Sequence, residues 1–67
     1  MEFKDVLKEI RLERNLTQKQ LAEMTGFSLS TINKWENEKK SPNMFSIKIL
    51  SEILNVSSDY LLGLQEY

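Results

Sequence analysis

The chain has 67 residues, with nine lysines and arginines against ten aspartates and glutamates, for a net charge of −1. A chain of this length forms one small domain, because it buries only about 60% of the surface that its unfolded form exposes. It contains neither cysteine nor histidine, which excludes disulfides, thiolate or imidazole catalysis and the usual zinc sites. We therefore predict that it is not an enzyme and that it needs no metal or cofactor.

The apolar content of 40% is ordinary for a globular protein, and no apolar run approaches the roughly 18 residues of a membrane span. The first ten residues, MEFKDVLKEI, mix acidic and basic groups and lack the layout of a signal peptide. These features predict a cytoplasmic protein. Only two glycines and one proline interrupt the chain, which favours an all-α domain over a fold rich in tight turns.

The first two predicted helices cover about residues 3–14 and 18–25. An apolar stripe at helical spacing marks the first helix and is formed by Phe3, Val6, Leu7 and Ile10. Asn15 can adopt the left-handed conformation that ends a helix. Thr17 and Gln20 match a capping box, which predicts the start of the second helix, and Gly26 predicts its end in a sharp turn.

Three more helices are predicted in the second half of the chain. Ser28 is the expected cap of a helix that ends near Asn37, and a polar loop closed by Pro42 follows. Asn43 begins a fourth helix of about twelve residues, which Asn55 ends. Ser57 or Ser58 begins a short fifth helix over the sequence DYLLGL, which Gly63 weakens near its end.

The third predicted helix has two chemically different sides. Its apolar side carries Ile32 and Trp35, so we expect Trp35, like Phe27, to lie in the core and not to stack on bases. A helix fits the DNA major groove, where short polar, amide and cationic side chains can bond to base edges. The pattern of two short helices joined by a glycine-containing turn therefore predicts base contacts from Ser30, Asn33 and Lys34.

Phosphate contacts require helix starts and polar or cationic groups around such a helix. The residues that meet this description are Gln18, Ser28, Thr31, Asn37, Lys39 and Lys40. Residues 17–40 hold four lysines against three glutamates, whereas residues 41–67 hold one lysine against three acids. The charge gradient is modest, so we expect weak nonspecific affinity and a shallow salt dependence.

The segment LTQKQLAEMTGFSLSTINKWENEKKSP resembles the helix-turn-helix family of Cro/CI-type repressors. The positions that match the family pattern are Leu16, Thr17, Gln18, Leu21, Ala22, Gly26, Ser28, Ile32, Trp35, Glu36, Asn37 and Pro42. The resemblance extends over about residues 3–63, with the helix-turn-helix core at about 17–37. It implies a five-helix lambda repressor-like domain, binding to a two-fold operator as a dimer, and a structural ion pair between Arg11 and Glu36.

Leu29 departs from the family pattern, because relatives often carry arginine or glutamine there. It could touch a thymine methyl group in the major groove, or it could pack at the edge of the helix. Both interpretations stay open at this stage. We include Leu29 among the candidate base contacts.

The fourth predicted helix is apolar on two sides. Ile47, Leu50 and Leu54, together with Ser51, form the expected core face, whereas a second stripe consists of Phe45, Ile49 and Ile53. Two alternatives account for the second stripe. It could belong to a symmetric dimer interface, extended by residues such as Tyr60 and Leu64, or it could be covered within the chain by Tyr60, Leu64 and Tyr67.

The sequence thus predicts a sequence-specific, double-stranded DNA-binding transcriptional regulator, of the phage repressor type and homodimeric. We expect neither a small-molecule ligand nor a membrane partner. Two alternatives remain: a protein-interaction module such as an antitoxin, and the DNA-binding fragment of a longer repressor.

Overall fold

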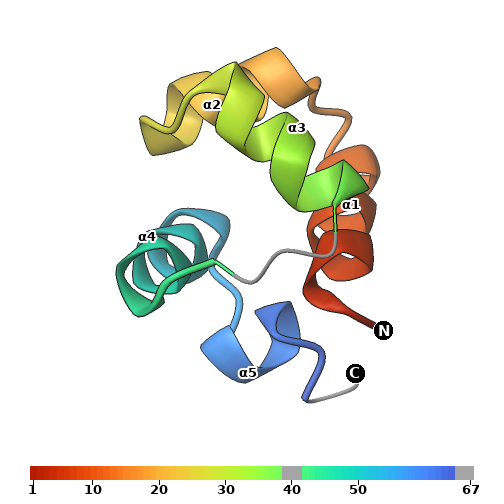
Figure 1. The fold of residues 1–67 in the computed structure, drawn as a ribbon, viewed down its shortest axis with the longest axis vertical. Coiled ribbons are helices and arrows are strands. Elements are labelled where there is room, and N and C mark those ends of the chain that lie inside the picture. Colours follow the sequence, from red (N-terminus) through yellow and green to blue (C-terminus); the bar gives the residue numbers. More distant parts are fainter. Residues whose placement is uncertain (39–41, 65–67) are drawn as a thin grey trace.

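The computed structural model describes residues 1–38 and 42–64, which contain five α-helices and no β-strand. The helices are α1 (Phe3–Glu13), α2 (Gln18–Thr25), α3 (Leu29–Asn37), α4 (Met44–Leu54) and α5 (Ser58–Leu61). Helices α2 and α3 lie together at one end of the molecule, and α1, α4 and α5 form the rest of the bundle (Figure 1). The predicted all-α, five-helix class is confirmed.

Side chains at the predicted positions begin most of the helices. The Thr17 hydroxyl accepts from the Gln20 amide at 3.0 Å, and the Gln20 side chain accepts from the Thr17 amide at 2.8 Å. Asn43 caps α4 in the same way, because its side chain accepts from the Ser46 amide at 2.7 Å. Each cap satisfies backbone N–H groups that have no partner inside the helix.

Left-handed residues end three segments where the sequence predicted a stop. Asn15 and Asn55 both have φ of 56°, and Gly26 has φ of 80°. The fifth helix is shorter than predicted, since it ends at Leu61 and not at the end of the sequence DYLLGL. Gly63 has φ of 77°, and a side chain there would overlap the Met1 carbonyl oxygen. The positive φ of Gly63 turns the chain just after the helix, and the Gly63 amide donates to the Tyr60 carbonyl at 3.0 Å.

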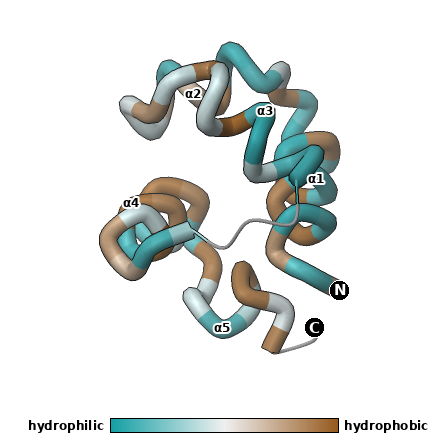
Figure 2. Tube along the Cα trace, in the orientation of Figure 1, coloured by the Kyte–Doolittle hydropathy of each residue, from teal (hydrophilic) through white to brown (hydrophobic). Residues whose placement is uncertain are grey.

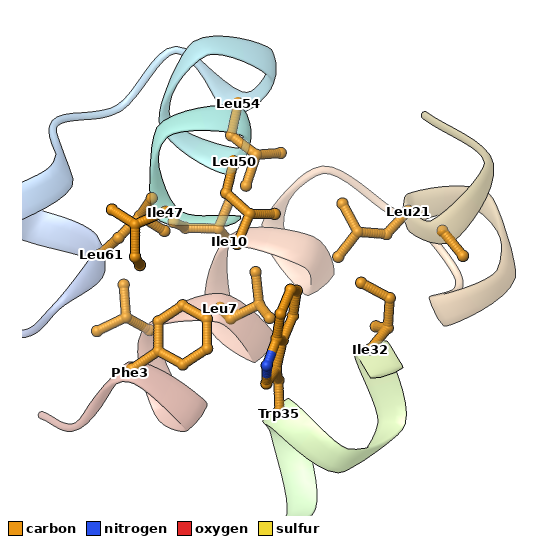
Figure 3. Close-up of a cluster of buried hydrophobic side chains, with 12 residues drawn as sticks. Phe3, Leu7, Ile10, Leu21, Ile32, Trp35, Ile47, Leu50, Leu54 and Leu61 are labelled. Carbon is orange, nitrogen blue, oxygen red and sulfur yellow. The ribbon is translucent and has the colours of Figure 1, made fainter. Parts of the chain in front are cut away.

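The core is one cluster to which every helix contributes (Figure 3). Leu7, Leu21, Ile32, Leu50 and Leu61 come from the five helices in order and are fully buried. All four residues of the predicted stripe on α1 are buried, as are Ile47, Leu50 and Leu54 of α4. Ser51, expected on the same face, is only half-buried, and its hydroxyl donates to the Val56 carbonyl at 2.7 Å.

Trp35 joins α1 to α3 through its ring contacts. Its ring meets Phe3 edge-on at a centroid distance of 5.8 Å and Phe27 at 4.9 Å. Such edge-to-face pairs stabilise a fold beyond the area that they bury. Trp35 is 7% exposed, so the prediction that it lies in the core is confirmed.

Candidate nucleic-acid interface

The turn between α2 and α3 is built from local hydrogen bonds. Gly26 ends α2 with its amide bonded to the Ala22 carbonyl, and the Thr25 hydroxyl donates to the Leu21 carbonyl at 2.8 Å. Ser28 then begins α3, its hydroxyl accepting from the Thr31 amide at 3.1 Å. Because Gly26 takes positive φ without strain, the chain reverses within a few residues and α3 packs against α2.

Helix α3 buries one side and exposes the other. Ile32, Trp35 and Glu36 are buried, and the candidate base contacts Leu29, Ser30, Asn33 and Lys34 are all exposed. Figure 2 shows hydrophilic residues on much of α3, in contrast to α4. Leu29 is 48% exposed, so its side chain is accessible to a thymine methyl group and is not enclosed at the helix edge.

The candidate phosphate contacts on α2 and α3 already have partners within the chain. The Ser28 and Thr31 hydroxyls lie 2.8 Å apart, and the Asn37 side chain donates to the Asn33 carbonyl at 2.9 Å. Gln18 contacts both Glu36 and Asn33. The predicted contacts from Lys39 and Lys40 lie outside the described residues.

A buried ion pair lies behind the exposed side of α3. Arg11 of α1 donates to both oxygens of Glu36, from Nε to Oε2 at 2.8 Å and from Nη2 to Oε1 at 2.9 Å. Its Nη1 donates to the Leu16 carbonyl at 2.8 Å. The side chains of Arg11 and Glu36 are 11% and 1% exposed, respectively. The hydrogen bond to Glu36 raises the pKa of Arg11 against the opposing effect of burial, so the guanidinium stays charged.

Arg11 thus bonds within the fold and is not itself one of the exposed side chains beside α3. Its two bonds to one carboxylate form the bidentate geometry that is strongest between these groups. The pair fixes α3 against α1 and positions the linker at Leu16 that leads into α2. This is the structural ion pair that the resemblance implied.

The second stripe of α4 stays largely uncovered within the chain. Phe45 is 69% exposed and Ile53 is 38% exposed, whereas Ile49 is half-buried. Tyr60 packs against the core, but Leu64 is 76% exposed and does not cover Phe45. Tyr67, the third residue proposed for cover, lies outside the described residues. Intrachain cover is therefore incomplete among the described residues.

Comparisons with known proteins agree with this geometry. A helix-turn-helix family model matches residues 7–61. The chain belongs to this helix-turn-helix family. A crystal structure of the P22 c2 repressor protein in complex with a synthetic operator is similar to it, with a TM-score of 0.86, 29% identity and coverage of 97% of this chain and 98% of that one.

Curated relatives of this helix-turn-helix chain are longer proteins. The HTH-type transcriptional activator BcrR of Enterococcus faecalis is 46% identical over 98% of this chain and 32% of its own length. The HTH-type transcriptional regulator ImmR of Bacillus subtilis is 37% identical over 90% of this chain and 47% of its own length. The chain therefore spans about a third to a half of the length of these relatives.

Two features of the helix-turn-helix domain were not predicted from the sequence. Met44, which is 82% exposed, adds to the apolar surface beside Phe45, although periodicity placed it in neither stripe. The hydrogen bonds that join Asn33 to Gln18 and Gln18 to Glu36 were also missed. Their partners are 15 and 18 residues apart, so local patterns carry no signal for them.

Proposed function

We propose that this helix-turn-helix domain binds double-stranded DNA sequence-specifically and regulates transcription. The observation that carries the proposal is the division of α3, which buries Ile32 and Trp35 and exposes Ser30, Asn33 and Lys34. These exposed side chains match the donor and acceptor groups that the major groove presents. The similarity to an operator-bound repressor supports the same function.

Base and backbone contacts have different roles in this proposal. Lys34, Asn33, Ser30 and Leu29 would read bases, whereas Gln18, Ser28, Thr31, Asn37, Lys39 and Lys40 would hold phosphates. With so few cations, the fall in log affinity with log salt should be shallow, at about 0.9 for each phosphate that is neutralised. The domain works as a binding module and not as an enzyme, and as a DNA-binding regulator it would act in the cytoplasm.

We further propose that two copies bind one operator, with α3 of each copy in successive major grooves about 34 Å apart. The exposed Phe45 and Ile53, with Ile49, Tyr60 and Leu64, would lie at or near the dimer interface. Phe45→Glu should then give a folded monomer in sedimentation experiments. A variant that stays both folded and dimeric would reject this interface.

The relatives' names include both an activator and a repressor. We propose repression as the outcome for this chain, because a protein that occupies an operator excludes other proteins from it without any further contact. A reporter gene placed downstream of the selected operator tests the direction. Increased transcription on expression of the protein would reverse this part of the proposal.

Selection from a random DNA library, followed by titration at two salt concentrations, tests the proposed function. Lys34→Ala should relax the base preference at one position by about 1–3 kcal/mol, whereas Lys39→Ala should weaken all sequences alike and reduce the salt slope by about one ion. If Lys34→Ala weakens selected and random DNA equally, its role as a base contact is wrong.

The exposed apolar stripe of α4 favours one second candidate, a protein-interaction module of the antitoxin kind. Against it, the exposed side of α3 lacks the aromatic anchors that protein interfaces favour. Failure of the wild-type protein to select any DNA sequence would favour this candidate over DNA binding.

A further inference from the structure

The side-chain amide of Gln18 connects the buried ion pair to the exposed side of α3. Its Nε2 lies 3.2 Å from Oε1 of Glu36, and its Oε1 lies 3.2 Å from Nδ2 of Asn33. Along this path the residues change from buried (Glu36) to half-buried (Gln18) to exposed (Asn33). A continuous set of hydrogen bonds therefore runs from Arg11 to a candidate base contact.

The chemistry of the groups assigns the direction of each bond. An ionised carboxylate only accepts, so Gln18 must turn its NH₂ group toward Glu36. Its carbonyl oxygen then faces Asn33, which must donate through Nδ2. The reverse orientation of Gln18 would set its carbonyl oxygen against a carboxylate oxygen. Because Arg11 holds Glu36 through both of its oxygens, the carboxylate cannot rotate away to relieve that contact.

We propose that Gln18 is a positioning residue for specificity, because it fixes the orientation of the Asn33 amide that reads a base. With one N–H directed to Gln18, Asn33 keeps its Oδ1 acceptor and one further N–H for a ligand. Adenine offers the complementary pair in the major groove, N6–H₂ as donor and N7 as acceptor. The inference rests on the proposed function and deepens it: Asn33 reads adenine, and Gln18 fixes the Asn33 amide in the orientation that this contact requires.

This role differs from the phosphate contact expected of Gln18. Loss of a phosphate contact weakens binding to all sequences alike, whereas loss of the positioning bond weakens binding only where Asn33 meets adenine. A substitution that keeps a donor at position 18 but removes the acceptor separates the two roles. Gln18→Lys does this, because an ammonium group can donate to Glu36 and to phosphate but cannot accept from Asn33.

The first experiment compares base preferences in the full chain. Operators selected by the wild-type protein are titrated with each base substituted at every position, using wild type, Gln18→Lys, Gln18→Met and Asn33→Ala. Glu23→Gln is the matched control, because it adds the same unit of charge at an exposed position of α2 outside these hydrogen bonds.

We expect Asn33→Ala to abolish a preference for adenine on the order of 10-fold at one position. Gln18→Lys should lose most of that preference, so its affinity should fall more on the selected operator than on random DNA. Gln18→Met should lose the preference too, and Glu23→Gln should keep it. Full retention of the adenine preference in Gln18→Lys would overturn the proposal, as would an equal loss for all sequences in Gln18→Met.

A second measurement needs no DNA and so separates this proposal from the function on which it rests. NMR relaxation of side-chain amides in the free protein should show the Asn33 NH₂ group ordered in wild type and mobile in Gln18→Lys and Gln18→Met. The Asn37 amide, which bonds to the Asn33 backbone carbonyl, serves as the internal control and should not change. Equal order of the Asn33 amide in all three proteins would refute the positioning role, whether or not DNA is bound.

Discussion

Removal of the Arg11 guanidinium should cost a large part of the stability of this domain. Arg11→Met keeps the apolar stem but removes two hydrogen bonds to Glu36 and one to Leu16. The Glu36 side chain is 1% exposed with Arg11 in place, and of its side-chain partners only Gln18, at 3.2 Å, would remain. Breaking a buried pair in this way typically costs about 3–5 kcal/mol.

That cost is comparable with the stability of the whole domain. A chain of 67 residues has a free energy of unfolding of roughly 3–10 kcal/mol, at about 0.05–0.15 kcal/mol per residue. Arg11→Met should therefore move the unfolding transition to a much lower urea concentration. The single, buried Trp35 provides the fluorescence signal for a urea titration.

Two further variants make the reasoning refutable. Lys8→Met removes an exposed cation from the same helix and should change the free energy of unfolding by less than about 0.5 kcal/mol. The double variant Arg11→Met/Glu36→Met leaves no stranded charge and should be more stable than Arg11→Met. If Arg11→Met costs no more than Lys8→Met, the pair behaves as a surface ion pair and the argument is wrong.

Substitutions at three other places test the packing and the caps. Gly63→Ala should lower the melting temperature more than Gly26→Ala does. Both residues have positive φ, but only Gly63 also faces the Met1 carbonyl. An equal fall in melting temperature for both variants would show that this contact carries no cost. Leu50→Ala should lower the free energy of unfolding in urea by about 2–5 kcal/mol, since Leu50 is fully buried. A loss below about 1 kcal/mol would mean that the site collapses around the smaller side chain. Thr17→Ala should lower the free energy of unfolding in urea by about 1 kcal/mol, because the cap of α2 is lost. Thr17→Ser keeps the capping hydroxyl and should retain most of that free energy.

The sequence predicted the features that depend on neighbouring residues. The caps at Thr17, Ser28 and Asn43 lie where expected, because each bonds to the backbone of its own helix. The turn at Gly26 and the buried stripe of α1 follow from equally local patterns. The exposed side of α3 was predictable for the same reason, since helical periodicity fixes which residues share a side.

Features that depend on tertiary contacts were not predictable from local patterns. The partnership of Arg11 with Glu36 spans 25 residues and was suggested only by the family resemblance. The close approach of Met1 to Gly63, two residues near opposite ends of the described chain, was not predicted either. Only the folded arrangement brings the amides of Gln18 and Asn33 together.

The contact between Met1 and Gly63 has a consequence for how the domain forms on the ribosome. Of the five described helices, α1 is made before the others, but it packs against α5, which follows the other four in the sequence (Figure 1). Translation adds about 5–20 residues per second, so α1 waits several seconds for its last packing partner. During that interval the apolar stripe of α1 can be covered only by the earlier helices. Native packing is complete only after Leu61 has left the exit tunnel.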